Sequence, residues 1–311
     1  MTRSPTALAW PELPLNAWRG TRDTLHMCTQ IIGKSLLASA PPQNHWWHTA
    51  LRVTSRGLYG SSGSEDRCFD VDVDLIGHVV ALRTEFGAAM VPLRPRSVRS
   101  FYEQYIETLR GLGIDLRIWT TPVEVRDPIP FERDEVHVEY DAGWASRFRQ
   151  VLHHVDASLK EVAASYVGKQ SPVHFFWGSF DLASTRFSGR RAPERTGADP
   201  VTREAYSHEV ISFGFWPGGI SPAGVSVDEP VLYGYAAPEP AGFREAALGV
   251  DAASYDPRLG EFILPYEAVR TAPDPVATVR AFCDAVYQAG ASSGAWDRAA
   301  IERLTGDPAV R

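Results

Sequence analysis

A weak internal repeat is the feature that most constrains the fold of this chain. A Gly-Lys pair occurs at residues 33–34 and again at 168–169, and each pair follows apolar residues at helical spacing. After each pair come a prolyl turn and an aromatic segment that opens with histidine, HWWH at 45–48 and HFFW at 174–177. Two copies of one pattern predict a chain built from two similar halves.

Hydrophobic periodicity predicts the same order of elements in both halves. Helices are expected over 21–37, 98–112 and 141–167, with Asp141 as a cap, and Asp274-Pro275 opens a fourth. The predicted strands are 45–53, 69–76, 78–84, 89–93, 174–187, 209–216, 231–235 and 261–265. Each half is therefore predicted to contain a helix, about four mostly antiparallel strands and a second helix, which gives an α+β fold.

A proline- and acid-rich segment at 122–139 marks the predicted boundary between the halves. Residues 1–121 form the first α+β half in this prediction, and residues 140–311 form the second half with its long loops. The polar stretches 187–205, 217–229 and 237–258 flank the aromatic strands, so we expect them to be site-covering lids or disordered loops.

Charge and cysteine usage narrow the class of partner. The 311 residues include 31 Lys and Arg against 38 Asp and Glu, a net charge of −7, which disfavours nucleic-acid and anionic-membrane partners. Cys28, Cys68 and Cys283 lie far apart, so neither a zinc ribbon nor a disulfide framework is supported and a reducing cytoplasm is expected. The start of the chain lacks the apolar core of a signal peptide, and no run is long enough for a membrane helix. The sequence leaves the cofactor and the oligomeric state open.

Familiar catalytic motifs are incomplete here. The segment Gly33-Lys34-Ser35 follows a helix and lacks the first glycine of a phosphate-binding loop, and Ser212 stands where a zinc protease motif at 208–209 needs its second histidine. Asp70, Asp72 and Asp74 alternate with apolar residues. We interpret them as the solvated face of a strand, with a divalent-metal site as the alternative.

The strongest site signal is the face of the predicted strand 174–187 that carries Phe175, Trp177, Ser179 and Asp181. Aromatic walls with a few fixed polar groups are typical of a ligand pocket. In the repeat, Asp181 aligns with Arg52, so the two are expected to share this face and could pair either structurally or as part of the site. On the first helix, His26, Gln30 and Lys34 form a polar stripe, which is either the wet side of the helix or part of the site.

Imidazole and carboxyl groups near this face are the candidates for acid–base chemistry, because imidazole titrates near neutrality. The catalytic candidates are His48, His174, Asp181, His208 and Glu209. Only three lysines occur beside 28 arginines, so a lysine in this chain is a candidate for ammonium chemistry. The substrate-binding candidates are Lys34, Trp46, Arg52, Lys169, Phe175, Trp177, Arg186, Arg190, Trp216 and Tyr233, with Phe213 as a further wall.

Several segments resemble a family of bacterial proteins classed as a domain of unknown function. They are WPELPL, LHMCTQIIGK, APPQNHWWH, RPRSV, SPVHFFWGSFDLASTRFSGR, YSHEVISFGFWPGG, YAAPEP and LGEFILPYEAVR. The resemblance spans nearly the whole chain and implies a free-standing soluble protein, without an activity, substrate or catalytic residue.

These observations lead to two predicted functions. The first is a small-molecule enzyme that acts on an anionic metabolite in an aromatic-walled pocket, using His, Asp or Glu acid–base chemistry or a single metal ion. The second is a non-catalytic module that binds a metabolite or a partner through the same aromatic cavity.

Overall fold

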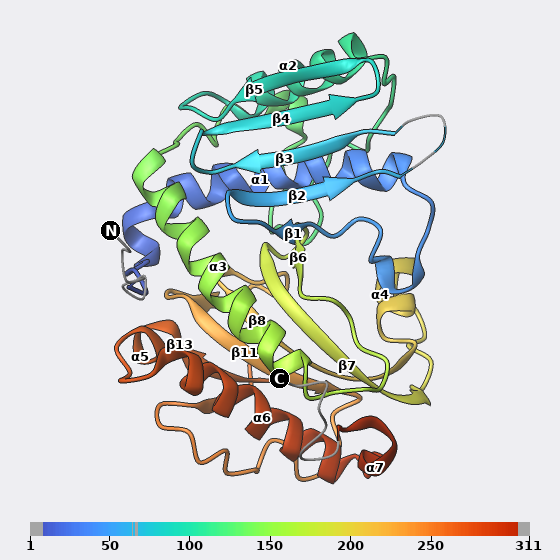
Figure 1. The fold of residues 1–311 in the computed structure, drawn as a ribbon, viewed down its shortest axis with the longest axis vertical. Helices are drawn as coiled ribbons and strands as arrows, with labels where there is room; N and C mark the ends of the chain where they lie inside the picture. Colours follow the sequence, from blue (N-terminus) through green and yellow to red (C-terminus); the bar gives the residue numbers. More distant parts are fainter. Residues whose placement is uncertain (1–8, 64, 66–67, 304–311) are drawn as a thin grey trace, which may run out of the picture.

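Two antiparallel sheets with helices packed on them make up the computed structural model, which describes residues 9–63, 65 and 68–303 (Figure 1). The predicted α+β class is confirmed. The helices are α1 (Leu15–Ser39), α2 (Val98–Gly111), α3 (Ala142–Ala163), α4 (Pro200–Ala205), α5 (Tyr266–Arg270), α6 (Pro275–Ser293) and α7 (Arg298–Ile301), with short 3-10 turns η1 (Asn44–Trp46) and η2 (Phe131–Arg133). The strands are β1 (Arg52–Val53), β2 (Gly57–Ser61), β3 (Asp70–Asp74), β4 (Val79–Thr84), β5 (Gly87–Pro92), β6 (His174–Phe176), β7 (Asp181–Arg191), β8 (His208–Trp216), β9 (Gly219–Ile220), β10 (Ser226–Val227), β11 (Val231–Ala237), β12 (Ser254–Asp256) and β13 (Glu261–Pro265).

The first sheet is a five-stranded meander in the order β1-β2-β3-β4-β5, and the second has six strands in the order β12-β13-β11-β8-β7-β6. Helix α2 packs on β5, while α6 packs on β8, β11 and α3. Strands β9 and β10 form a separate small hairpin between β8 and β11 in the chain.

Local sequence signals position the helices and strands well. Asp141 accepts a hydrogen bond from the N–H of Trp144 at the start of α3, and Asp274 does the same for Ala277 at the start of α6. Strand β3 alternates between buried valines and partly exposed aspartates, as its two-residue period predicts. Capping and periodicity therefore decide these elements without help from the rest of the fold.

Helix α1 is a central helix rather than an amphipathic surface helix. It lies between the first sheet and the second part of the chain (Figure 1), and His26, Gln30 and Lys34 are all at least 95% buried. The interpretation of this stripe as a solvated face is therefore wrong. Packing on both sides of the helix covers its polar residues, which then need partners inside the protein.

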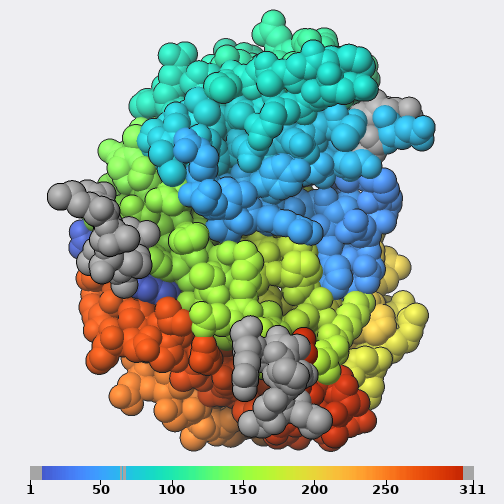
Figure 2. All heavy atoms as spheres, in the orientation of Figure 1, coloured from blue at the N-terminus to red at the C-terminus, as the bar shows by residue number. Residues whose placement is uncertain are grey.

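The two sheets meet at one pair of residues. The N–H of Leu51 donates to the carbonyl oxygen of Phe175 at 2.9 Å, and the N–H of Phe175 donates to Leu51 at 2.7 Å. A single cluster of buried apolar side chains includes members from both predicted halves. The space-filling view shows a continuous surface from the cyan atoms through the green to the red (Figure 2). The division at 122–139 stays a prediction.

The predicted strand 174–187 is a β-hairpin. Strands β6 and β7 pair with each other, so that His174 lies opposite Ala183, and residues 177–180 form the turn between them. Phe180 adopts a left-handed conformation at φ 60°. Phe175 pairs with Leu182, whereas Asp181 pairs with Phe176. Paired residues point to the same face, so Phe175 and Asp181 lie on opposite faces of the hairpin.

The segments aligned in the repeat differ in structure. Residues 45–48 contain the 3-10 turn η1, with His45 and Trp46 at φ 57° and 62°, where a strand was predicted. Helix α3 ends at Ala163 rather than at the predicted residue 167. Both parts keep the order of helix, antiparallel sheet and helix, and the duplication itself stays a hypothesis.

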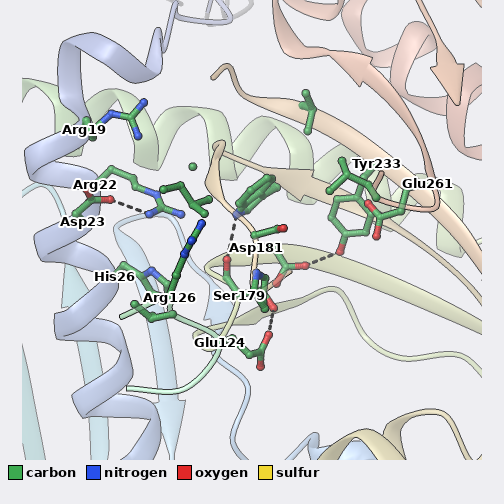
Figure 3. A pocket seen from close by; sticks show the side chains of 18 of the residues that line it. Arg19, Arg22, Asp23, His26, Glu124, Arg126, Ser179, Asp181, Tyr233 and Glu261 are labelled. Atoms are coloured by element: carbon green, nitrogen blue, oxygen red, sulfur yellow. Dashed lines mark hydrogen bonds and ion pairs between the residues drawn. The ribbon is translucent and has the colours of Figure 1, made fainter. Parts of the chain in front are cut away.

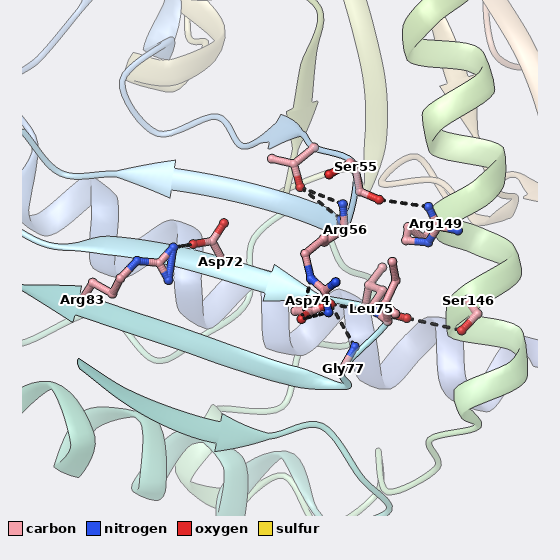
Figure 4. A network of polar contacts seen from close by, with 12 residues as sticks. Ser55, Arg56, Asp72, Asp74, Leu75, Gly77, Arg83, Ser146 and Arg149 are labelled. Carbon is pink, nitrogen blue, oxygen red and sulfur yellow. Dashed lines mark hydrogen bonds and ion pairs between the residues drawn. The ribbon is translucent and has the colours of Figure 1, made fainter. Parts of the chain in front are cut away.

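The aspartates of β3 are paired on the outer face of the first sheet (Figure 4). Arg56 donates to Asp74 at 2.7 and 2.9 Å, Arg83 donates to Asp72, and the hydroxyl of Tyr59 donates to Asp70 at 2.8 Å. The three carboxylates therefore belong to a partly exposed strand face with local partners, as the first of the two interpretations predicts.

The predicted long loops contain secondary structure. Strand β7 extends to Arg191 and α4 follows it, the segment 217–229 carries the hairpin β9–β10, and the segment 237–258 carries β12. Cys28, Cys68 and Cys283 are free thiols. Among the described residues, every helix is too short or too polar to cross a membrane.

Candidate functional site

A pocket of about 430 Å³ lies where the N-terminal half of α1, the segment 122–139 and the second sheet meet (Figure 3). Its volume is in the range of small-molecule sites. Helix α1 supplies Arg19, Arg22 and His26 on one side, while Asp181, Tyr233 and Glu261 come from β7, β11 and β13 on the other. The hairpin β9–β10, which is part of the predicted loop 217–229, contributes Gly219 and Ile220.

Asp181 is the buried acid of the pocket, with 8% of its surface exposed. The hydroxyl of Tyr233 donates to its Oδ2 at 2.5 Å, and its Oδ1 is buried with no hydrogen-bond partner among the described residues. Burial raises the pKa of Asp181 to about 7, against the stabilising effect of Tyr233. The carboxyl group therefore exchanges its proton near neutral pH.

Gly214 on β8 makes the contact between Tyr233 and Asp181 feasible. Gly214 pairs with Tyr233 on β11, and a Cβ at this position would lie 2.6 Å from the Tyr233 hydroxyl oxygen and 2.1 Å from the carbonyl oxygen of Leu182. The glycine leaves space for the tyrosine ring to lie over β8 and reach β7.

Glu261 is a second acid at the same end of the pocket. It is partly buried, and no hydrogen bond or ion pair joins it to another side chain in the described part of the chain. Burial, with repulsion from Asp181, raises the pKa of Glu261 to about 8. Two neighbouring acids with raised pKa values keep their protons to a higher pH than two ordinary carboxylates. The charge of one acid affects the titration of the other, so the two titrate as a coupled pair.

Glu124 brings a third carboxylate to this region from the segment 122–139. Its Oε2 accepts a hydrogen bond from the Ser179 hydroxyl at 2.5 Å, and the residue is exposed. Gly178 provides the room, because a Cβ there would lie 2.4 Å from Oε1 of Glu124.

Aromatic side chains form the wall beside the acids. The rings of Tyr233 and Tyr235 are stacked along β11 with centroids 6.3 Å apart, and the Tyr235 hydroxyl lies 3.1 Å from that of Tyr206. The indole N–H of Trp216 donates to the carbonyl oxygen of Ser179 at 3.1 Å, which fixes the ring at the pocket edge.

The opposite end of the pocket is basic. Arg22 is 7% exposed, donates to Asp23 at 2.7 Å, and has a buried Nε with no partner in the described chain. Gly219, at φ 132°, allows this guanidinium to approach the backbone, since a Cβ would lie 2.8 Å from it. Arg19 and Arg126, with 43% and 61% of their side chains exposed, add two guanidinium groups. A hydrogen bond to Asp134 raises the pKa of His137, which lines the same end.

The buried polar residues of α1 hold the pocket together. His26 donates from Nε2 to the carbonyl oxygen of Gly178 at 2.8 Å, and burial lowers the pKa of His26 to about 3, so the ring is neutral. Gln30 donates to the carbonyl oxygen of Val123 at 2.6 Å and accepts from the Val123 N–H at 3.1 Å. These bonds fix the β6–β7 turn and the segment that carries Glu124.

Of the residues proposed from sequence, Asp181, Trp216 and Tyr233 line this pocket. The expected pair of Asp181 and Arg52 does not form, because Tyr233 bonds to Asp181 while Arg52 is exposed on β1.

The three histidine candidates, His48, His174 and His208, lie outside this pocket, around η1. Lys169 Nζ lies 2.8 Å from Nε2 of His45, and the rings of His45 and His208 are 5.8 Å apart. His174, 1% exposed, packs against Trp47, and burial lowers its pKa to about 4. His48 lies beside Trp46 on the same turn.

The remaining candidates contact the core or other protein groups outside the pocket. Phe175 and Trp177 belong to the core, and Lys34 packs on the Trp177 ring at 6.0 Å. Arg186 is 2% exposed and donates to the carbonyl oxygen of Val162 at 2.6 Å, so it does not reach the pocket. Arg190 and Glu209 form an ion pair at 2.7 Å near the end of α6. Phe213 is fully buried.

Sequence reasoning missed Arg22, Tyr235 and Glu261. Arg22 extends the stripe of His26 and Gln30 by one helical turn, so a search at four-residue spacing would have found it. Tyr235 shares a strand face with Tyr233, and Glu261 opens an otherwise apolar strand. The convergence of these elements is not visible in the sequence.

Residues 10–303 match the model of a family of unknown function, DUF5996. The chain belongs to this family. The pocket-lining residues named above all fall within the match, so the pocket is part of the family's domain. Neither the curated proteins nor the solved structures gave a match to the chain.

Proposed function

We propose that this member of the family is an enzyme that binds a small anionic molecule in the pocket and performs acid–base chemistry on it with Asp181 and Glu261. The observation that carries the proposal is the pair of acids with pKa values of about 7 and about 8 facing the arginines of α1 across one pocket (Figure 3). Perturbed acids in a cleft are the usual mark of a general acid or base.

The division of the pocket suggests a role for each end. Arg22, with Arg19 and Arg126 nearer to solvent, supplies guanidinium groups that bind a carboxylate or phosphate and orient the molecule. Asp181 then accepts or donates a proton at the other end, and the hydrogen bond from Tyr233 holds its carboxyl group in place. A general base is most effective when its pKa lies near the pH at which the enzyme works.

The acids, not the histidines, are the residues we assign to proton transfer. The one histidine of the pocket that lies on α1, His26, donates its Nε2 proton to a backbone carbonyl and is held neutral. His48, His174 and His208 lie around η1 and do not line the pocket. Among the described residues, no group of three or more His, Cys, Asp or Glu side chains is arranged to hold a metal ion.

The cellular setting is part of the same proposal. Three free, widely separated cysteines fit a reducing cytoplasm, and the net charge of −7 fits a small-molecule ligand better than a nucleic acid.

Carboxyl-carbon NMR titration of the Asp- and Glu-labelled protein tests the proposal directly. We expect the resonances assigned through Asp181→Asn and Glu261→Gln to titrate between about pH 6 and 9, whereas Asp74, whose pKa is lowered, serves as a control that titrates only in acid. Titration of both acids near pH 4 would remove the basis of the proposal.

Turnover separates the enzyme from the binding module. A set of carboxylated and phosphorylated metabolites incubated with the protein is analysed by mass spectrometry, with Asp181→Asn and the surface variant Asp72→Asn in parallel. The enzyme predicts a product with the wild type and with Asp72→Asn, reduced by about a hundredfold or more in Asp181→Asn. Saturable binding without product in all three proteins would favour the module.

A further inference from the structure

We propose that the ligand of this pocket carries a basic amine opposite its anionic group, and that the ammonium lies between Asp181, Glu261 and the rings of Trp216, Tyr233 and Tyr235. This inference rests on the proposed function and specifies its substrate class as a zwitterion with separated charges.

Apart from Asp23, which pairs with Arg22 on the helix side, the charges of the pocket are segregated. Figure 3 shows Arg19 and Arg22 on the helix side, Tyr233 and Glu261 on the sheet side, and Asp181 and Ser179 between them. A ligand with a negative charge only would satisfy the first side and leave the acids without a counter-charge. A ligand with charges at both ends matches the whole pocket.

The acids lack a cation of their own. Within residues 9–63, 65 and 68–303, Asp181, Glu261 and Glu124 take part in no ion pair, and Asp181 Oδ1 is buried without a partner. Asp181 is more than nine-tenths buried and lines the pocket. Buried carboxylates in native proteins are generally paired, so a ligand cation is the partner that this arrangement lacks.

The aromatic wall favours a cation over a neutral polar group. Trp216, Tyr233 and Tyr235 line the pocket, and the two tyrosine rings are stacked with an interplanar angle of 14°. Aromatic faces attract ammonium groups within about 6 Å of the ring centre. An amine held by carboxylates and rings together is bound more tightly than by either alone.

Release of protons on binding should distinguish an amine ligand from an acid without an amine. In the empty pocket Asp181 and Glu261 retain protons near neutrality, and an ammonium beside them favours their ionised forms. Binding of an amine at about pH 7 therefore releases protons, whereas binding of the corresponding acid without the amine does not.

Isothermal titration calorimetry with matched probes tests the inference. The probes are γ-aminobutyrate, δ-aminovalerate and ε-aminohexanoate, each compared with the unsubstituted carboxylate of the same chain length, in two buffers of different ionisation enthalpy. We expect one amino acid of the series to bind at least about tenfold more tightly than its matched carboxylate, with proton release. Glu261→Gln and Asp181→Asn should each remove most of that preference, and Asp72→Asn should keep it.

The outcomes distinguish the inference from the proposed function. Equal binding of amino acids and carboxylates, or binding of no amino acid in the series, overturns the inference. Carboxylate binding together with neutral pKa values of Asp181 and Glu261 then leaves the proposed function standing. Ordinary pKa values near 4 for both acids overturn the proposed function first.

Discussion

Carboxylates of the two sheets have opposite environments. On the first sheet Asp74 accepts from Arg56 and from the N–H groups of Ile76 and Gly77 (Figure 4). On the second sheet Asp181 accepts from Tyr233 and forms no ion pair with any residue that the structure describes. Burial alone would raise the pKa of Asp74, but its hydrogen-bond donors outweigh burial and the pKa lies below its ordinary value. The pKa of the same residue type is lowered where hydrogen-bond donors compensate its burial and raised where they do not.

The pH dependence of stability should have opposite signs for the two sheets, and this is the largest expected effect. A pKa raised from 3.8 to about 7 means that Asp181 contributes its full stability below about pH 4 and loses it as pH rises through 7. The rise of about three units corresponds to roughly 4 kcal/mol of unfolding free energy. Urea denaturation from pH 5 to 9 should show this fall, reduced in Asp181→Asn with Glu261→Gln.

Asp74 is the internal control for that measurement. Its lowered pKa contributes stability above the unfolded value, which is lost as pH falls through the folded value. Asp74→Asn should therefore lower the unfolding free energy by a constant amount above pH 4, weaken the loss of stability below pH 4, and leave the slope of the fall between pH 5 and 9 intact. An unchanged slope in the Asp181 and Glu261 double variant would contradict the assignment.

Removing the anchor of the pocket segment should have the second largest effect. Gln30→Leu leaves the N–H and carbonyl of Val123 and the carbonyl of Gly178 without this partner, which costs about 2–3 kcal/mol. Hydrogen exchange should become faster at Val123 and Glu124, while β3 and β4 keep their protection. Uniform acceleration over both sheets would show that Gln30 stabilises the whole fold instead.

Adding a cation beside Asp181 should lower the pKa of Asp181, as Arg56 does for Asp74 on the first sheet. Ser179→Lys places an ammonium at the edge of the pocket beside Glu124 and near Asp181, so the pKa of Asp181 should fall by about one unit. Carboxyl-carbon NMR measures the shift. Ser179→Gln has a similar length without the charge and should leave the pKa of Asp181 unchanged; the same fall in both variants would exclude an electrostatic cause.

Removing a cation from the first sheet should have the smallest effect. Arg56 is 57% exposed, so Arg56→Met should cost no more than about 1 kcal/mol in unfolding free energy and raise the pKa of Asp74 slightly. Thermal denaturation at low and high salt measures the loss. Arg83→Met is the matched variant at Asp72, and a large loss at either position would mean that these surface pairs carry more of the fold than their exposure suggests.

Capping residues and hydrophobic periodicity correctly predicted the helices and strands that depend on neighbouring residues only. Helices α2, α3 and α6 and strands β3, β4, β5, β8, β11 and β13 lie close to their predicted positions. The prediction was wrong where a chain reversal or a long-range contact dominates: residues 177–180 form a turn, and residues 44–46 form η1. The buried polar stripe of α1 was misjudged because periodicity does not tell whether both sides of a helix are covered.

The candidate site was predicted in part for the same reason. The sequence by itself determined the α+β class, the family and three pocket residues, Asp181, Trp216 and Tyr233, because composition and spacing are local properties. Only the tertiary structure decided that Arg22 and Glu261, far apart in the chain, face one cavity and that His48, His174 and His208 do not. Burial and the distance to the nearest charge set the chemistry of an acid, and both arise when distant segments pack together.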